Sequence, residues 1–324
     1  MVTIADKKIV AIGGGTGLST MLRGLKAYTE QITAIVTVAD DGGGSGMIRE
    51  DLHLLPPGDI RNCIMALADT EPIMEKLMTY RFGAGRLKGQ SFGNLFLAAM
   101  CGISDNFEQA VRRVSDVLAV KGRVLPVTEQ NVSLGAEFED GTIVVGESVI
   151  PKKSTEYGSR ISRMFLSPKS VQPVPDCLKA IAEADLIILG PGSLYTSIIP
   201  NLLVEGMPEA IRGSRAKTVY VCNVMTQMGE SDDLTAYDHV QAVNSHAGGS
   251  IVDACLVNIE PVPGDLQKKY IAEHSTPVEV DENRFAGSGI MLLQGELLDI
   301  SKGYVRHDYR RLAEAIARLA QDLK

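Results

Sequence analysis

The feature that most constrains this chain is a strand that runs directly into a glycine-rich turn and then into a helix. The apolar strand at residues 8–12 is followed by a helical pattern at residues 18–28, and the turn between them consists of Gly13, Gly14, Gly15, Thr16 and Gly17. Such a turn places unpaired backbone N–H groups beside the positive end of a helix dipole, with no side chains in the way. The sequence therefore predicts an anion site here, typically for a phosphate.

A second strand, at residues 32–38, also ends in a polar, glycine-rich stretch. It leads into Asp40 and Asp41, and Ser45 lies among the glycines that follow. Dinucleotide-binding folds keep an acid at this position, where it accepts hydrogen bonds from ribose hydroxyls. A single glycine turn is often only a tight connection without a ligand, but two successive strand ends of this type favour a nucleotide site.

The glycine spacing matches neither of the two common phosphate motifs completely. The dinucleotide fingerprint fits at Gly13 and Gly15, but Leu18 stands where its third glycine belongs. The phosphate-loop motif requires Lys and then Ser or Thr after its last glycine, and Leu18-Ser19 excludes it. A dinucleotide-dependent oxidoreductase is therefore disfavoured. NAD or another dinucleotide still fits such a cleft, because it also carries a pyrophosphate and a ribose.

Polar residues begin two further helices. A Pro-Pro-Gly break precedes Asp59, which the pattern predicts to cap a helix that contains Asn62. Ser91 and Asn94 open a helix that runs to residue 103 and is apolar on nearly every side, so we expect it to be buried. Polar side chains at the start of a core helix suggest a ligand contact, and an ordinary serine cap is the alternative.

Between about residues 122 and 167 the pattern changes to short β-rich pieces. Their apolar content is too small for a separate domain, so we expect a β-meander insertion within a single domain of residues 1–324. After it, a strand runs into a third glycine turn, which contains Gly190, Gly192 and Ser193. The next strand, which begins at residue 217, ends at Asn223.

Strands and helices alternate along most of the chain, and the polar tips fall at strand ends. This alternation predicts an α/β fold with a Rossmann-like, mostly parallel sheet, helices on both faces and the β-rich insertion. Ligands of such sheets bind at the carboxyl ends of the strands. Near the C-terminus, Arg306 and His307 precede the last helix, and the arginine offers a fork of donors suited to a diphosphate or a carboxylate. An exposed arginine without a ligand is the alternative.

Composition narrows the class of protein. A formal net charge of −8 argues against a general nucleic-acid binder, so any phosphate has to be held by local groups. The five cysteines are scattered singly, which is typical of reduced thiols in the cytosol. We expect neither a signal peptide nor a membrane span, and therefore a cytoplasmic protein.

The sequence contains no recognisable catalytic or metal motif. The five histidines show no metal-binding spacing, and the chain has no nucleophile elbow. We therefore assign no catalytic and no metal residue. Asp40, Asp41 and Asp59 could hold a divalent cation against a diphosphate, or they could serve as ribose acceptors and a helix cap. The sequence does not choose between these roles.

Five motifs, in this order, resemble those of a known family: GGGTGLSTMLRGL, VTVADDGGGSGMIRE, LLPPGDIRNC, SFGNL and GPGSLYTSIIPNLL. Over nearly its whole length the chain is similar to the bacterial YvcK proteins, or gluconeogenesis factors, within the superfamily of CofD-like 2-phospho-L-lactate transferases. The resemblance implies a Rossmann-like, cytoplasmic protein that binds UDP-sugars such as UDP-N-acetylglucosamine. It also implies a link to cell shape, wall synthesis and growth on gluconeogenic carbon sources.

Carried over by position, the resemblance implies one nucleotide site. Its first glycine turn would line the pyrophosphate, the second would face it, and Arg306-His307 matches an Arg-His pair associated with nucleotide-sugar binding. Tyr309 departs from the family, which often has a threonine suited to phosphorylation there, so phosphoregulation is not carried over. The residues assigned to the site are Gly13, Gly14, Gly15, Thr16, Gly17, Asp40, Asp41, Ser45, Asp59, Asn62, Ser91, Asn94, Gly190, Gly192, Ser193, Asn223, Arg306 and His307.

Two functions follow from the resemblance. The favoured one is a regulatory protein that binds a UDP-sugar, requires no cofactor and acts through a protein partner in wall-precursor metabolism, as a homo-oligomer. The alternative is an enzyme like the phospholactate transferases, which would move a phospholactyl-type group from a nucleoside diphosphate ester to an acceptor, with Mg²⁺ held by the acids.

Overall fold

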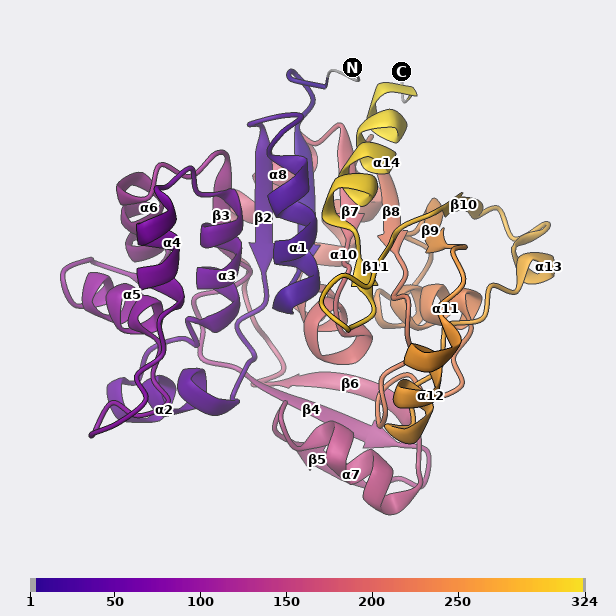
Figure 1. The fold of residues 1–324 in the computed structure, drawn as a ribbon, viewed down its shortest axis with the longest axis horizontal. Coiled ribbons are helices and arrows are strands. Elements are labelled where there is room, and N and C mark those ends of the chain that lie inside the picture. Colours follow the sequence, from indigo (N-terminus) through magenta and orange to yellow (C-terminus); the bar gives the residue numbers. More distant parts are fainter. Residues whose placement is uncertain (1–3, 323–324) are drawn as a thin grey trace.

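The computed structural model describes residues 4–322, and a parallel β-sheet forms their centre (Figure 1). Seven strands in this part of the chain form the sheet, and every neighbouring pair runs parallel. From one edge to the other the strands are β10 (Met291–Gly295), β9 (Ala254–Asn258), β8 (Lys217–Val221), β7 (Leu186–Leu189), β1 (Ile9–Gly13), β2 (Ile32–Val36) and β3 (Arg123–Pro126). The expected α/β, Rossmann-like fold is confirmed.

Both faces of the sheet are buried, because successive side chains of each strand point to opposite faces and nearly all are apolar. In β1, Ile9 and Ala11 belong to one core, whereas Val10 and Ile12 belong to the other. The first core is covered by α1 (Gly15–Leu25), α3 (Gly58–Leu67), α6 (Phe107–Val117) and α14 (Tyr309–Asp322). The second is covered by α8 (Pro175–Ala182), α9 (Ile199–Leu202), α10 (Met207–Gly213) and α11 (Ala236–His246).

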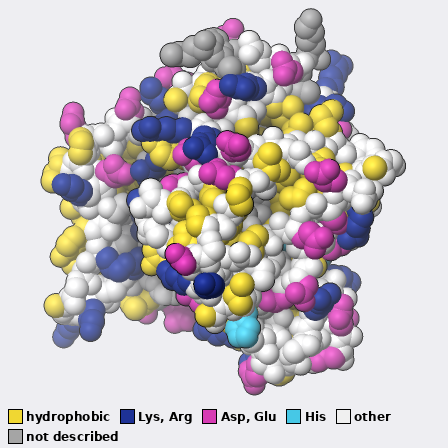
Figure 2. Space-filling model, turned by 45° about the vertical axis from the view of Figure 1, so that its right-hand side comes forward, with side chains coloured by type: hydrophobic (Ala, Val, Ile, Leu, Met, Phe, Trp, Pro, Cys, Tyr) yellow, Lys and Arg dark blue, Asp and Glu magenta, His cyan; other side chains and the backbone are white. Residues whose placement is uncertain are grey.

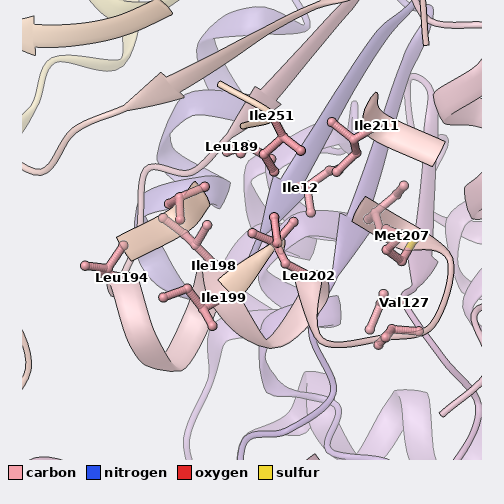
Figure 3. Close-up of a cluster of buried hydrophobic side chains, with 14 of the residues drawn as sticks. Ile12, Val127, Leu189, Leu194, Ile198, Ile199, Leu202, Met207, Ile211 and Ile251 are labelled. Carbon is pink, nitrogen blue, oxygen red and sulfur yellow. The ribbon is translucent and has the colours of Figure 1, made fainter. Parts of the chain in front are cut away.

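Figure 3 shows part of the second core. Ile12 of β1 and Leu189 of β7 lie in it with Ile198 and Leu202. Ile198 ends a π-helical turn, η1 (Leu194–Ile198), which leads directly into α9. The residues that follow β7 are therefore held against the sheet by apolar packing, which fixes the position of the glycine turn between them.

The strand order reverses between β1 and β7. The chain proceeds from β1 outward through β2 to β3, then returns to β7 on the other side of β1 and proceeds outward to β10. The two loops that leave β1 and β7 therefore run in opposite directions and leave a crevice between them, which is where ligands of doubly wound sheets bind. The two glycine turns at residues 13–17 and 190–193 are these two loops.

The β-rich insertion is a small antiparallel sheet at the carboxyl end of the main sheet (Figure 1). It consists of β4 (Ser133–Phe138), β5 (Ile143–Val145) and β6 (Ile161–Ser167), with α7 (Ile150–Tyr157) between the last two strands. The first β-rich piece, at residues 123–126, is instead strand β3 of the main sheet. Its Val124 lies in one core and its Leu125 in the other, as in the remaining strands of that sheet.

The predicted burial of the apolar helix that follows Ser91 is wrong in part. Helix α5 (Phe92–Gly102) buries Gly93, Asn94 and Leu97, but its other side chains are partly exposed. It lies at the edge of the molecule, where α3, α4 and α6 cover only one of its sides. The remaining elements are α2 (Gly43–Leu52), α4 (Pro72–Thr79), α12 (Gly264–Ala272), α13 (Glu282–Phe285), β11 (Leu298–Asp299) and β12 (Arg306–His307). Within residues 4–322 no helix is both long and apolar enough to span a membrane.

Candidate functional site

The two glycine turns touch each other at the point where the strand order reverses. A Cβ atom added to Gly17 would lie 2.6 Å from the carbonyl oxygen of Pro191, and one added to Gly13 would lie 3.7 Å from Cα of Gly190. Gly190 itself has φ +80, a conformation that favours glycine. The missing side chains therefore allow the two loops to approach one another closely.

A cleft of about 350 Å³ opens beside this contact. Its walls come from both glycine turns, from the loop after β8 and from the segment that contains β12. Eight of the sequence-predicted residues line it: Gly15, Thr16, Gly17, Gly192, Ser193, Asn223, Arg306 and His307. Asn223 also fixes the second turn, because its side-chain amide donates a hydrogen bond to the carbonyl of Gly192 at 2.8 Å.

Asp59 closes the inner end of the first turn. The predicted capping of its own helix is wrong, since α3 begins at Gly58 with Pro57 as N-cap and no side-chain cap. Instead, Asp59 Oδ2 accepts a hydrogen bond from the backbone N–H of Gly15 at 2.7 Å. It thus occupies one of the free amides at the N-terminus of α1 and leaves those of Thr16 and Gly17 for a ligand.

Gly14 makes this arrangement sterically feasible. A Cβ atom at this position would lie 2.7 Å from Asp59 Oδ2 and equally close to the side chain of Thr37. Any larger residue would therefore displace the carboxylate from the helix terminus.

The two acids that follow β2 do not line the cleft. Asp40 Oδ1 accepts a hydrogen bond from the N–H of Gly42, and Ser45 lies close to it across Gly58. Both oxygens of Asp41 are occupied by the insertion, through the N–H groups of Glu147 and Ser148, each at 2.9 Å. Asp41 therefore ties the insertion to the end of the main sheet.

Carboxyl groups from four segments lie near one another behind the first turn. Burial raises the pKa of Asp59 to about 6, with a further contribution from Asp40. Burial also raises the pKa of Glu147 to about 8, and Asp40 and Asp41 are the next largest causes. Burial raises the pKa of Glu230 to about 7, against hydrogen bonds from Thr196 and from the backbone of the η1 turn. Sequence reasoning did not assign Glu147 and Glu230 to the site.

This group of acids does not form a complete metal site. Within residues 4–322 no set of three or more His, Cys, Asp and Glu side chains is arranged to hold a metal ion. Mg²⁺ commonly uses only one or two protein carboxylates and takes its remaining ligands from phosphate and water. The acids therefore suit a cation only together with a bound phosphate ester.

Arg61 connects the remaining predicted residues. Its guanidinium donates to Asn62 Oδ1 at 2.6 Å and to Ser91 Oγ. Ser91 is the N-cap of α5 and accepts a hydrogen bond from the N–H of Asn94, whose Oδ1 is buried without a partner. These residues lie beside the acids and do not line the cleft, and the sequence gave no direct signal for Arg61.

The last wall of the cleft is a short antiparallel pair, β11 and β12, in which His307 pairs with Leu298 and Arg306 with Asp299. Arg306 is exposed, and no carboxylate among residues 4–322 forms an ion pair with it. Helix α12 holds this wall in place, because the hydroxyl of Tyr270 accepts a hydrogen bond from the N–H of Val305 at 2.9 Å.

Comparisons with known proteins agree with this arrangement. The family model for 2-phospho-L-lactate transferase CofD matches residues 9–298. The chain belongs to the CofD family. The CofD relatives include the gluconeogenesis factor of Bacillus subtilis, which is 49% identical over 97% of this chain and 98% of its own length. A relative from Clostridium acetobutylicum is 55% identical over 99% of this chain and 71% of its own length.

A solved structure of the CofD family has the same fold. The crystal structure of a protein from Bacillus halodurans superimposes with a TM-score of 0.92 at 48% identity, over 96% of this chain and 99% of that one. The suspected kinship with the gluconeogenesis factors is therefore confirmed. Arg306 and His307 lie beyond the range that the CofD family model matches, so this wall of the cleft belongs to the alignments with the gluconeogenesis factors.

Proposed function

We propose that this chain is a cytoplasmic regulatory protein that binds a UDP-sugar, such as UDP-N-acetylglucosamine, in the cleft between its two glycine turns. In this proposal the bound state is communicated to a protein partner that controls wall-precursor supply, and so to cell shape and growth on gluconeogenic carbon sources. The name of the Bacillus subtilis relative, a gluconeogenesis factor, supports the metabolic setting. We also propose that the protein acts as a homo-oligomer.

The observation that carries the proposal is the meeting of two bare backbone turns with one unpaired arginine. The amides of Thr16 and Gly17 stand at the positive end of the α1 dipole, and Arg306 lines the same cleft. An overall charge of −8 makes local groups necessary for holding an anion. On the face shown in Figure 2, Lys and Arg side chains are interspersed with Asp and Glu and do not form one basic surface.

Calorimetric titration with UDP-N-acetylglucosamine tests the proposal. We expect saturable binding to the wild type and about tenfold weaker binding to Arg306→Ala, since a charge-assisted contact to phosphate is lost. Arg215→Ala is the matched control, because it removes the same charge at an exposed position before the start of β8, whereas the cleft lies at the strand's other end. The absence of heat and of a thermal shift at millimolar ligand would refute the proposal, and NAD in a parallel titration tests the dinucleotide alternative.

A transferase activity is the second candidate, and the match to the CofD family model is the observation that favours it. Asp40 and Asp59 would then hold Mg²⁺ against a nucleoside diphosphate ester, and the metal would stabilise the leaving nucleotide. The test is incubation with a guanylyl phospholactate ester, a deazaflavin acceptor and Mg²⁺, followed by product analysis. Turnover that Asp59→Ala abolishes would establish the enzyme and overturn the purely regulatory proposal.

A further inference from the structure

His307 differs from a surface histidine in being almost fully enclosed while still lining the cleft. Only 8% of its surface is exposed. Its backbone is held by pairing with Leu298 in β11, and helix α1 packs against the same short strand. The ring is therefore held in place from two sides and cannot turn freely toward solvent.

The two ring nitrogens have different surroundings. The carbonyl of Cys222, just past the end of β8, is the hydrogen-bond partner of the ring. Nε2 is buried and has no partner, so the nitrogen that faces this carbonyl is Nδ1. A carbonyl oxygen only accepts hydrogen bonds, and Nδ1 must therefore carry the proton. Burial lowers the pKa of His307 to about 4, so the ring is neutral near pH 7 and its Nε2 has a lone pair and no hydrogen.

Two other buried histidines show what is particular about this one. In His239 and His246, Nδ1 lies 2.8 Å and 2.7 Å from the backbone carbonyl four residues earlier in helix α11. His246 Nε2 already accepts a hydrogen bond from the N–H of Met164 at 3.0 Å. His239 is packed in the core, where its ring stacks on Tyr220. Of these three rings, only that of His307 lines the cleft.

We propose that Nε2 of His307 is an obligate hydrogen-bond acceptor that selects the ligand of the cleft by requiring a neutral donor, a hydroxyl or a ring N–H, at that point. The inference rests on the proposed nucleotide-sugar binding and adds the chemistry of one contact. An ionised phosphate or carboxylate has only lone pairs and would repel Nε2, so the charged part of the ligand belongs at the amides of the glycine turns. A ligand without a donor at this point leaves Nε2 buried and unpaired, which costs affinity.

Nuclear magnetic resonance of the histidine rings tests the inference directly. Long-range ¹H–¹⁵N spectra of the wild type should show His307 with a proton on Nδ1 and none on Nε2, the signals being assigned by their loss in His307→Gln. Saturating UDP-N-acetylglucosamine should shift the Nε2 resonance of His307, whereas those of His239 and His246 stay unchanged. A proton on Nε2 in the free protein, or an Nε2 signal that saturating ligand does not move, would overturn the inference.

Calorimetry with two variants provides the second test. His307→Phe keeps a ring but no acceptor, and we expect about tenfold weaker binding of UDP-N-acetylglucosamine. His307→Gln can place an amide oxygen near the position of Nε2, so we expect it to retain affinity within about threefold of the wild type. Equal binding by the wild type and His307→Phe would refute the inference and leave the proposed function intact. If the wild type itself does not bind, both fail. If His307→Phe does not fold, the wild-type spectra decide.

Analogues identify the source of the donor. N3-methyl-UDP lacks the ring N–H of uracil, whereas 2′-deoxy-UDP and 3′-deoxy-UDP each lack one ribose hydroxyl. The analogue that lacks the donor should bind equally to the wild type and to His307→Phe, and the others should still distinguish the two proteins. If all three still distinguish them, the donor lies on the sugar attached to the diphosphate. If UDP itself does not distinguish them, the same assignment follows.

Discussion

Single carboxylates carry much of the organisation at this end of the sheet. Asp59 binds the terminus of a helix other than its own, and Asp41 binds the backbone of the insertion. Neither role is visible in the sequence, because each partner lies far along the chain: Glu147 is 106 residues from Asp41. Since these acids also lie near Glu147 and Glu230, their mutual repulsion makes the protein's stability depend on pH.

Glu147→Gln should stabilise the ligand-free protein above neutral pH. Its pKa is raised from 4.5 to about 8 by burial and by neighbouring acids, so ionisation is less favourable in the folded state than in the unfolded state. The stability that Glu147 contributes is therefore fully present below about pH 4.5 and is lost as the pH rises through 8. At pH 8.5 we expect the variant to gain about 1 kcal/mol after allowance for solvent screening, or roughly 2 °C in Tm.

Thermal unfolding between pH 5 and pH 9 measures this effect. The matched control is Glu139→Gln, which removes an exposed acid from the same insertion and should follow the wild-type curve. If Glu147→Gln also follows the wild-type curve over the whole range, burial of the Glu147 carboxyl is not a source of instability.

At the scale of elements, the two glycine turns act as one unit. The first turn connects β1 to α1, the second connects β7 to η1, and each fills the space that a side chain of the other would need. Because α1 begins inside this contact, the direction of its free amides depends on how closely Pro191 can approach Gly17. The geometry of the anion site is thus set by packing between two turns.

Gly17→Ala should damage both the fold and the cleft. Its new Cβ would lie 2.6 Å from a backbone oxygen of Pro191, so one of the turns has to move. We expect a loss of about 2 kcal/mol in the free energy of unfolding and at least tenfold weaker UDP-N-acetylglucosamine binding. Urea denaturation and calorimetry measure the two effects.

Gly213→Ala provides a matched control for this substitution. Gly213 is the last residue of α10, and an added Cβ would have no neighbour within 4 Å. We expect unchanged binding and a stability equal to the wild type or slightly higher, since alanine favours helix more than glycine does. A Gly17→Ala protein that behaves like this control would show that the two turns can separate without consequence.

The whole molecule is built on one sheet with a hydrophobic core on each face. Cys63 belongs to one core and Cys177 to the other, and both are fully buried free thiols. Neither core can open without exposing strands that the other core also covers. We therefore expect both thiols to become reactive at the same urea concentration when labelling is followed by mass spectrometry.

Cys101 serves as the internal reference for that experiment. It is partly exposed on α5 and should react before the transition. Separate midpoints for Cys63 and Cys177 would mean that the two faces unfold independently. Such a result would contradict the picture of a single cooperative unit.

Much of the fold followed from the sequence because its signals are local. A strand, a glycine turn and a helix are adjacent in the chain, and parallel strands bring all their ends to one edge, so the pairing of the turns at residues 13–17 and 190–193 was predictable. Glu147 and Glu230 were not, because each lies in an irregular segment without periodicity and reaches the site only through tertiary structure. The partial exposure of α5 was missed because apolar composition does not reveal how many neighbours an edge helix has.

The cleft draws its walls from Gly15 at one extreme and His307 at the other. A nascent chain on the ribosome therefore lacks part of the pocket until synthesis has passed the last strand pair, even though the first glycine turn emerges almost at once. Ligand capture becomes a property of the nearly finished polypeptide. Loading with metabolite would then distinguish complete molecules from interrupted ones.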